Sequence, residues 1–142
     1  MKKLPLLVAL LLSGGWALAQ SNCPTPVLKV YQDNQEVNVE GSAMPASVKL
    51  VLTASPDCAP ATAYQLTGAE VTLLRGKRPI LPTRKFDKPE MDLTDFKKVY
   101  QPGDRLFVSV PASGVTMTSG GGKQEKYPAT GASAFQVNWR LN

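Results

Sequence analysis

The sequence contains no histidine, and this absence removes several kinds of site at once. Without an imidazole the chain cannot build a Ser-His-Asp triad, a Cys-His dyad, a histidine general base or a zinc site with histidine ligands. No nucleophile constellation is recognisable either. The sequence therefore predicts a non-enzymatic protein with no catalytic residues, no metal site and no cofactor.

Aromatic residues are also few, at 7% of 142 residues, whereas the hydrophobic share of 43% is ordinary. A chain of this length and composition is sufficient for one compact core, so we expect neither a disordered tail nor a multidomain enzyme.

The first 19 residues have the organisation of a secretory signal peptide. Lys2 and Lys3 precede an apolar run over 4–12, and Ala17-Leu18-Ala19 forms an A-x-A cleavage site. The alternative is a retained membrane helix, but this run is shorter than the ~20 residues needed to span a bilayer. We expect cleavage after Ala19, a single domain over 20–142, export to the periplasm or the medium, and no stable membrane insertion afterwards.

Loss of the signal peptide also changes the charge. The formal net charge of the whole chain is +5, and removing Lys2 and Lys3 lowers it to +3. The basic character is then too weak to support a nucleic-acid partner.

Cysteine occurs only twice, at Cys23 and Cys58. Export to an oxidising compartment predicts that these residues form one disulfide bond. An intermolecular bridge or a reactive thiol is the alternative, but neither cysteine has a histidine or a C-x-x-C neighbour to lower its pKa.

Several segments of the mature chain alternate with a period of two, which is typical of half-buried strands. Such alternation occurs over 48–52, 71–73, 106–110 and 135–141, and a further hairpin is expected around Asp33-Asn34, with Val37 and Val39 in its second strand. The 12 prolines and 11 glycines punctuate these segments. This spacing predicts an all-β sandwich or barrel.

This pattern leaves only one segment that could form a helix. Residues 93–100, after the candidate cap Asp92, place apolar side chains on one helical face, although a strand-edge loop is an equal interpretation. The proline-rich stretch 75–89 predicts an extended connection or an edge strand. Pro102-Gly103 suits the centre of a type II turn, and 119–123 suits a hairpin tip.

A cluster of cations within residues 75–88 is the first candidate binding surface. It comprises Arg75, Lys77, Arg78, Arg84, Lys85 and Lys88. Such a basic edge could bind an acidic protein, an anionic polysaccharide or lipid headgroups, but charge on an edge strand can also serve only to prevent aggregation. The acidic residues downstream lack the D-x-D-x-D-G order of a calcium loop.

Exposed aromatic residues could instead stack on sugars. The candidates are Tyr31, Tyr100, Tyr127 and Trp139. Trp139 shares the apolar face of its strand with Phe135 and Val137, so we expect it in the core.

The order of features in the C-terminal half resembles the C-terminal domain of the gliding-motility protein GldM family. The resemblance rests on the strand A-E-V-T-L-L-R-G-K-R at 69–78, the amphipathic segment 91–100, the stretch Q-P-G-D-R-L-F-V at 101–108 and the closing strand 135–141. It covers about half of the chain. It implies a single immunoglobulin-like antiparallel β-sandwich with at most one short helix, in the bacterial cell envelope and associated with gliding or type IX secretion.

The resemblance carries over no catalytic residue. Members of the family carry a membrane helix and tandem domains, whereas we expect this chain to have a cleavable signal peptide and one domain. We therefore expect an exported protein-interaction module whose partner is another envelope protein. The alternative is a carbohydrate- or peptidoglycan-binding module, and a small secreted hydrolase or inhibitor is a third interpretation.

Overall fold

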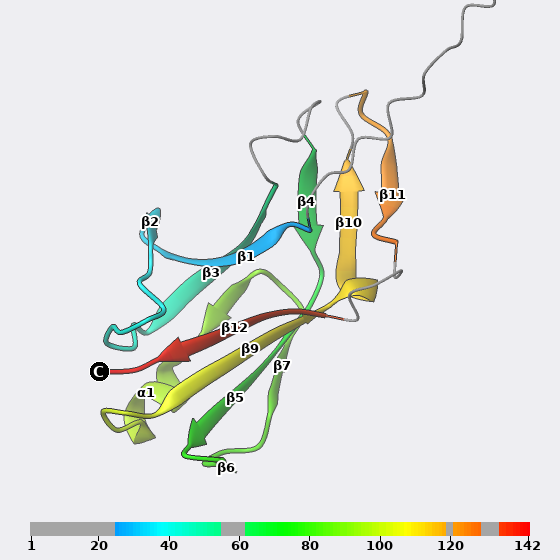
Figure 1. The fold of residues 1–142 in the computed structure, drawn as a ribbon. Helices are drawn as coiled ribbons and strands as arrows, with labels where there is room; N and C mark the ends of the chain where they lie inside the picture. The colour runs from blue at the N-terminus through cyan, green and yellow to red at the C-terminus, as the bar shows by residue number, and fades with distance from the viewer. Residues whose placement is uncertain (1–24, 55–61, 119–120, 129–133) are drawn as a thin grey trace, which may run out of the picture.

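The computed structural model describes residues 25–54, 62–118, 121–128 and 134–142. These residues form antiparallel sheets and one short helix, which confirms the all-β fold expected from the sequence (Figure 1). The predicted signal peptide and the predicted Cys23–Cys58 disulfide lie outside the described residues.

The N-terminal sheet has the strand order β2-β1-β3-β8. Its strands are β1 (Val27–Gln32), β2 (Gln35–Glu36), β3 (Ser47–Thr53) and β8 (Glu90–Asp92). Asp33 and Asn34 both have positive φ, at 49° and 63°, as the two-residue turn of a tight hairpin requires. The expected hairpin is therefore present.

The second strand of this hairpin is shorter than expected. It ends at Glu36, and Val37 retains only one bond to β1, from its N–H to the Val30 carbonyl at 2.8 Å. Val39 has crossed to the other sheet, where its carbonyl accepts the Arg140 N–H at 2.8 Å. The prediction of a strand through Val37 and Val39 was wrong because this segment crosses between the sheets.

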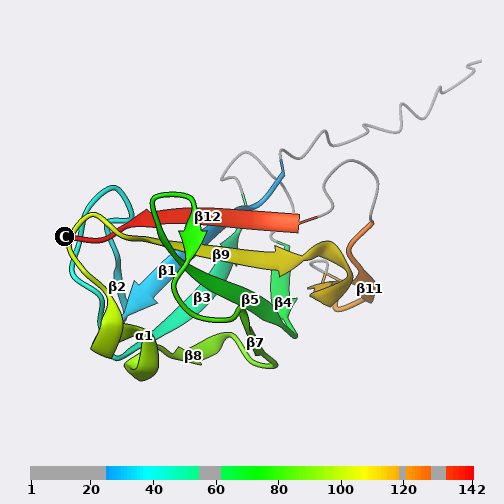
Figure 2. The ribbon, with the colours of Figure 1, turned by 90° about the horizontal axis from the view of Figure 1, so that it is seen from below.

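The C-terminal sheet has the order β12-β9-β5-β6, and β7 also pairs with β5. Its strands are β5 (Ala69–Arg75), β6 (Arg78–Pro79), β7 (Arg84–Phe86), β9 (Arg105–Pro111) and β12 (Ala134–Arg140). Figure 2 shows β12, β9 and β5 running side by side. The short strands β6 and β7 form one edge of the sheet, as expected for the proline-rich stretch, and β12 forms the other edge.

The order β1-β3-β8 in one sheet and β12-β9-β5 in the other is that of an immunoglobulin-like sandwich. The large apolar side chains of the two sheets meet in one core. The most completely buried of them are Val30, Leu50, Val71, Leu73, Met91, Leu106, Val108 and Trp139. The alternation seen in the sequence therefore points one face of each sheet inward.

A third, projecting sheet has the order β11-β10-β4 and stands beyond the sandwich (Figure 1). Its strands are β4 (Ala63–Leu66), β10 (Val115–Thr118) and β11 (Gln124–Lys126). It continues two strands of the sandwich, because β4 leads into β5 and β9 leads through the 3₁₀ turn η1 (Ala112–Gly114) into β10. At the bend, the N–H and the hydroxyl of Thr67 both donate to the Gly114 carbonyl, at 2.8 and 2.9 Å.

The helix α1 (Thr94–Val99) lies between β8 and β9. Asp92 accepts the Thr94 N–H at 2.9 Å, and Leu93 and Phe96 are buried, whereas Val99 is 38% exposed. The helical interpretation of this segment is confirmed and the loop interpretation was wrong. The type II turn is also confirmed, since Gly103 has φ of 93° and Asp104 donates its N–H to the Gln101 carbonyl at 3.0 Å.

Candidate protein-binding surface

The structure distributes the six cations of the predicted basic edge over several environments. Arg75 ends β5, Lys77 lies in the turn after it and Arg78 belongs to β6. Arg84 and Lys85 belong to β7, and Lys88 lies between β7 and β8. Three of the six form ion pairs with acidic side chains of other segments.

Arg75 is engaged most firmly. Its Nε and NH2 groups donate to the two carboxylate oxygens of Asp104 at 3.0 and 2.9 Å, and NH2 also donates to the Val99 carbonyl at 3.2 Å. Asp104 is only 2% exposed and also accepts the Gln101 N–H at 2.7 Å. Arg75 therefore ties the end of β5 to the helix and to the turn before β9.

This arrangement changes the acid–base properties of both groups. The hydrogen bonds from Arg75 hold the pKa of the Asp104 carboxyl below its ordinary value, and the same bonds raise the pKa of Arg75. A charge-assisted bidentate pair of this kind is among the strongest polar contacts in proteins. Arg75 therefore stabilises the fold by holding these segments together.

Arg84 and Lys85 form exposed pairs. Arg84 NH1 lies 3.0 Å from Asp95 Oδ2 of α1, and Lys85 Nζ lies 3.5 Å from Glu70 Oε1 of β5. Solvent weakens such pairs, so both cations retain some capacity for an external acid.

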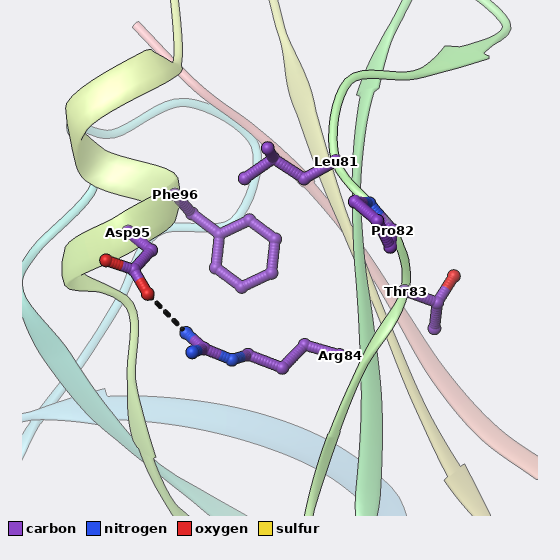
Figure 3. Close-up of a pocket in the computed structure, with 6 residues that line it drawn as sticks. All are labelled: Leu81, Pro82, Thr83, Arg84, Asp95 and Phe96. Atoms are coloured by element: carbon purple, nitrogen blue, oxygen red, sulfur yellow. Dashed lines mark ion pairs between the residues drawn. The ribbon is translucent and has the colours of Figure 1, made fainter.

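A pocket of about 440 Å³ opens between α1 and the segment that joins β6 to β7 (Figure 3). Its lining residues are Leu81, Pro82, Thr83, Arg84, Asp95 and Phe96. The Phe96 ring faces Leu81 and Pro82, and the Arg84–Asp95 ion pair borders the pocket (Figure 3). Because the two charged groups neutralise each other, the pocket can hold an apolar group but presents no unpaired acid or base within these lining residues.

A different pair of cations lies on the C-terminal sheet. Arg105 of β9 and Arg140 of β12 are Cα partners in the C-terminal sheet, and Leu74 of β5 is the next partner of Arg105. Their strand neighbours Leu106 and Trp139 are fully buried, so both arginines lie on the outer face of the sheet. We call Arg105 and Arg140 the arginine pair.

The arginine pair has an unusual electrostatic environment. Both residues are exposed, and neither forms an ion pair within the part of the chain that the structure describes. Like charges directly opposite each other on adjacent strands repel. Lys77 and Arg78, after the C-terminal end of β5, add two exposed cations at this end of the sheet, again with no ion pair among the described residues. The arrangement can bind carboxylates or other anions.

Reasoning from the sequence did not find the arginine pair, because its members are 35 positions apart and only sheet pairing brings them together. A signal was nevertheless present. Each arginine occupies a polar position in an alternating strand, so pairing the two expected strands in an antiparallel register would have placed both on one face.

Of the four aromatic candidates, Trp139 is buried and the three tyrosines are half-buried. Trp139 is fully buried, as expected, and its indole N–H donates to the Ser42 hydroxyl at 2.8 Å. The Tyr127 ring packs against the Phe135 ring, with 5.1 Å between the ring centroids. It also lies near the Tyr64 ring, with 6.3 Å between those centroids. Tyr31 and Tyr100 are half-buried.

Comparison with protein-family models, with curated proteins and with solved structures gave no match. In the described ranges, no helix has the length and apolar character needed to cross a membrane. The same residues contain no cluster of three or more Cys, Asp or Glu side chains arranged to hold a metal ion.

Proposed function

We propose that this chain is an exported, non-enzymatic protein-interaction module of the bacterial cell envelope, and that its partner is another envelope protein with an acidic contact segment. The observation that carries the proposal is the arginine pair: two exposed guanidinium groups opposite each other on a rigid sheet, without an acidic partner in the described chain. Such a pair costs the free domain stability through repulsion, and a bound carboxylate would remove this cost.

Four further features support this proposal. An immunoglobulin-like sandwich offers a rigid face for protein contact, and the signal peptide expected from the sequence would deliver it to the envelope. The order of motifs over 69–141 resembles a component of gliding motility and type IX secretion, which is a machinery of interacting envelope proteins. Lys77 and Arg78, which form no ion pair with a described residue, extend the basic surface beyond the arginine pair.

The first test is affinity capture from an envelope extract with the full chain, exported and processed by its own host. The variant Arg105→Glu/Arg140→Glu reverses the charge of the arginine pair. The control Lys97→Glu/Lys126→Glu makes the same change in net charge at exposed residues of α1 and β11. We expect the wild-type and control proteins to recover the same envelope protein in similar amounts. The Arg105→Glu/Arg140→Glu variant should recover at least about tenfold less of it, since charge-assisted contacts contribute about 1.5–3 kcal/mol.

Equal recovery by all three proteins would contradict the role of the arginine pair. Retention by purified cell wall or glycans, with no specific protein recovered, would contradict the proposed function and would favour the carbohydrate-binding alternative.

A further inference from the structure

Strand β12 forms an open edge of the C-terminal sheet. It pairs with β9 along all seven of its residues. On its other side, the backbone hydrogen bonds to described residues are confined to the C-terminal end: the Arg140 N–H donates to the Val39 carbonyl at 2.8 Å, and the Arg140 carbonyl accepts the Ser42 N–H at 3.3 Å. No described strand pairs with this side of β12 before Arg140.

The direction of the uncovered backbone groups follows from these contacts. The Arg140 amide points away from β9, whereas the Leu141 N–H points back and donates to the Asp104 carbonyl at 2.9 Å. Alternate residues of a strand direct their amides to the same side. The N–H and C=O groups of Gln136 and Asn138 therefore point outward like those of Arg140, and both residues are exposed.

Within the sandwich, the other described sheet edges are protected in ways that β12 is not. The edges of the N-terminal sheet are the short strands β2 and β8, and the latter carries Glu90 and Asp92. The opposite edge of the C-terminal sheet contains Pro79, Arg84 and Lys85. Proteins commonly use shortness, charge and proline to stop an edge from pairing with another chain. Between Ala134 and Asn138, β12 has no charge and no proline, and its register with β9 is unbroken.

We propose that the partner binds by strand addition: an extended acidic segment pairs with β12 over 134–138 and directs a carboxylate toward the arginine pair. A partner residue opposite Asn138 would be a diagonal neighbour of Arg140 on the outer face, within reach of a long side chain such as glutamate. This inference rests on the proposed function and adds how the partner binds.

The charge of β12 identifies the occupant as an acidic partner and not a second copy of the chain. The sequence Ala134–Arg140 contains no acidic residue. Pairing β12 with its own copy would therefore place no carboxylate beside Arg140 and would add two further arginines to the same sheet. Strand addition by an acidic segment would supply partners both to the outward backbone groups of β12 and to the arginines, which have none among the described residues.

The test uses a synthetic seven-residue peptide in which glutamate alternates with valine, and a second peptide with lysine in place of glutamate. Binding to the wild-type chain is followed by NMR, with amide hydrogen exchange as the readout. We expect the acidic peptide to slow exchange at Gln136 and Asn138 and to leave Val137 unchanged, because the Val137 amide already faces β9. The lysine peptide should produce neither effect.

Two variants separate backbone pairing from side-chain contact. Asn138→Pro removes the outward N–H without removing a bond to β9, and Asn138→Ala keeps that N–H but removes the side-chain amide. We expect Asn138→Pro to weaken peptide binding at least about fivefold, the value of one lost hydrogen bond, and Asn138→Ala to bind like the wild type. The exchange pattern of the wild-type chain provides an independent readout if the proline variant fails to fold.

Strand addition is overturned if the acidic peptide does not bind, if it binds without slowing exchange at Gln136 and Asn138, or if a folded Asn138→Pro variant binds normally. Concentration-dependent dimerisation through 134–138 would also overturn it in favour of a second copy. Any of these results, combined with envelope-protein capture that still depends on the arginine pair, would leave the proposed function in place and reject only the binding mode.

Discussion

Arg105 and Arg140 lie directly opposite each other on the adjacent strands β9 and β12. Their repulsion makes the free domain less stable than it would be if one of the two side chains were neutral. We expect Arg105→Gln to raise the free energy of unfolding by a few tenths of a kcal/mol at low salt, since glutamine removes the charge and keeps a polar side chain at this exposed position. The gain should disappear at high salt, where repulsion between exposed charges is screened. Urea denaturation at low and high ionic strength measures both effects.

The matched control for that change is Lys126→Gln, which neutralises an exposed cation of β11 that has no arginine opposite it. It should leave stability nearly unchanged at both salt concentrations. A loss of stability in Arg105→Gln at low salt would show that Arg105 has a stabilising partner in the free domain, which would remove the main argument for an external acid.

At the scale of elements, the Asp104–Arg75 contact joins the end of β5, the end of α1 and the turn before β9. Asp104→Asn keeps the shape but loses the charge-assisted pair, so we expect it to lower the free energy of unfolding by about 1–3 kcal/mol at pH 7. The pKa of Asp104 is lower in the folded state than in the unfolded state. The contribution of its carboxylate to stability is therefore fully present above the ordinary aspartate pKa of about 3.9, and it is lost as pH falls through the pKa of the folded state.

The stability difference between wild type and Asp104→Asn should therefore be constant from pH 7 to about 5 and should shrink at pH values below about 3.9. Chemical denaturation at several pH values tests this. The control Asp95→Asn removes the exposed pair with Arg84 and should cost much less. A pH-independent difference for Asp104→Asn would contradict the assignment of its effect to the carboxylate.

The elements also show how far the sequence determines the fold. Period-two alternation was sufficient for β3, β5, β9 and β12, because a buried face leaves a clear pattern in a half-exposed strand. It was insufficient around Val37 and Val39, where apolar side chains pack against the core from a crossing segment and not from a strand. The bends into the projecting sheet likewise depend on contacts between distant residues, such as Thr67 with Gly114.

The candidate site was less predictable than the fold for the same reason. A run of cations in the sequence marked residues 75–88, but contacts with distant segments of the fold then supplied acids to Arg75, Arg84 and Lys85. Sheet pairing also brought Arg105 to Arg140. Local charge density identifies a charged segment, whereas the availability of that charge for a partner depends on long-range neighbours.

At the scale of the whole molecule, the available binding features gather on the C-terminal sheet. The arginine pair lies on its outer face, and the open edge of β12 borders the same face. Phe107 of β9 is half-buried on this face. It lies two residues from Arg105 along β9 and directly opposite Asn138 of β12. The N-terminal sheet presents charged side chains that are paired with one another, such as Lys29 with Glu36 at 3.0 Å.

The most direct test of partner binding at the C-terminal sheet is photo-crosslinking in the native host, with p-benzoylphenylalanine in place of Phe107. Tyr31, a half-buried aromatic residue on the outer face of the N-terminal sheet, provides the matched control position. We predict one predominant adduct from position 107, with an envelope protein crosslinked through an acidic segment, and no such adduct from position 31. Crosslinking only to glycan, equal adducts from both positions, or no protein adduct from position 107 would contradict the account.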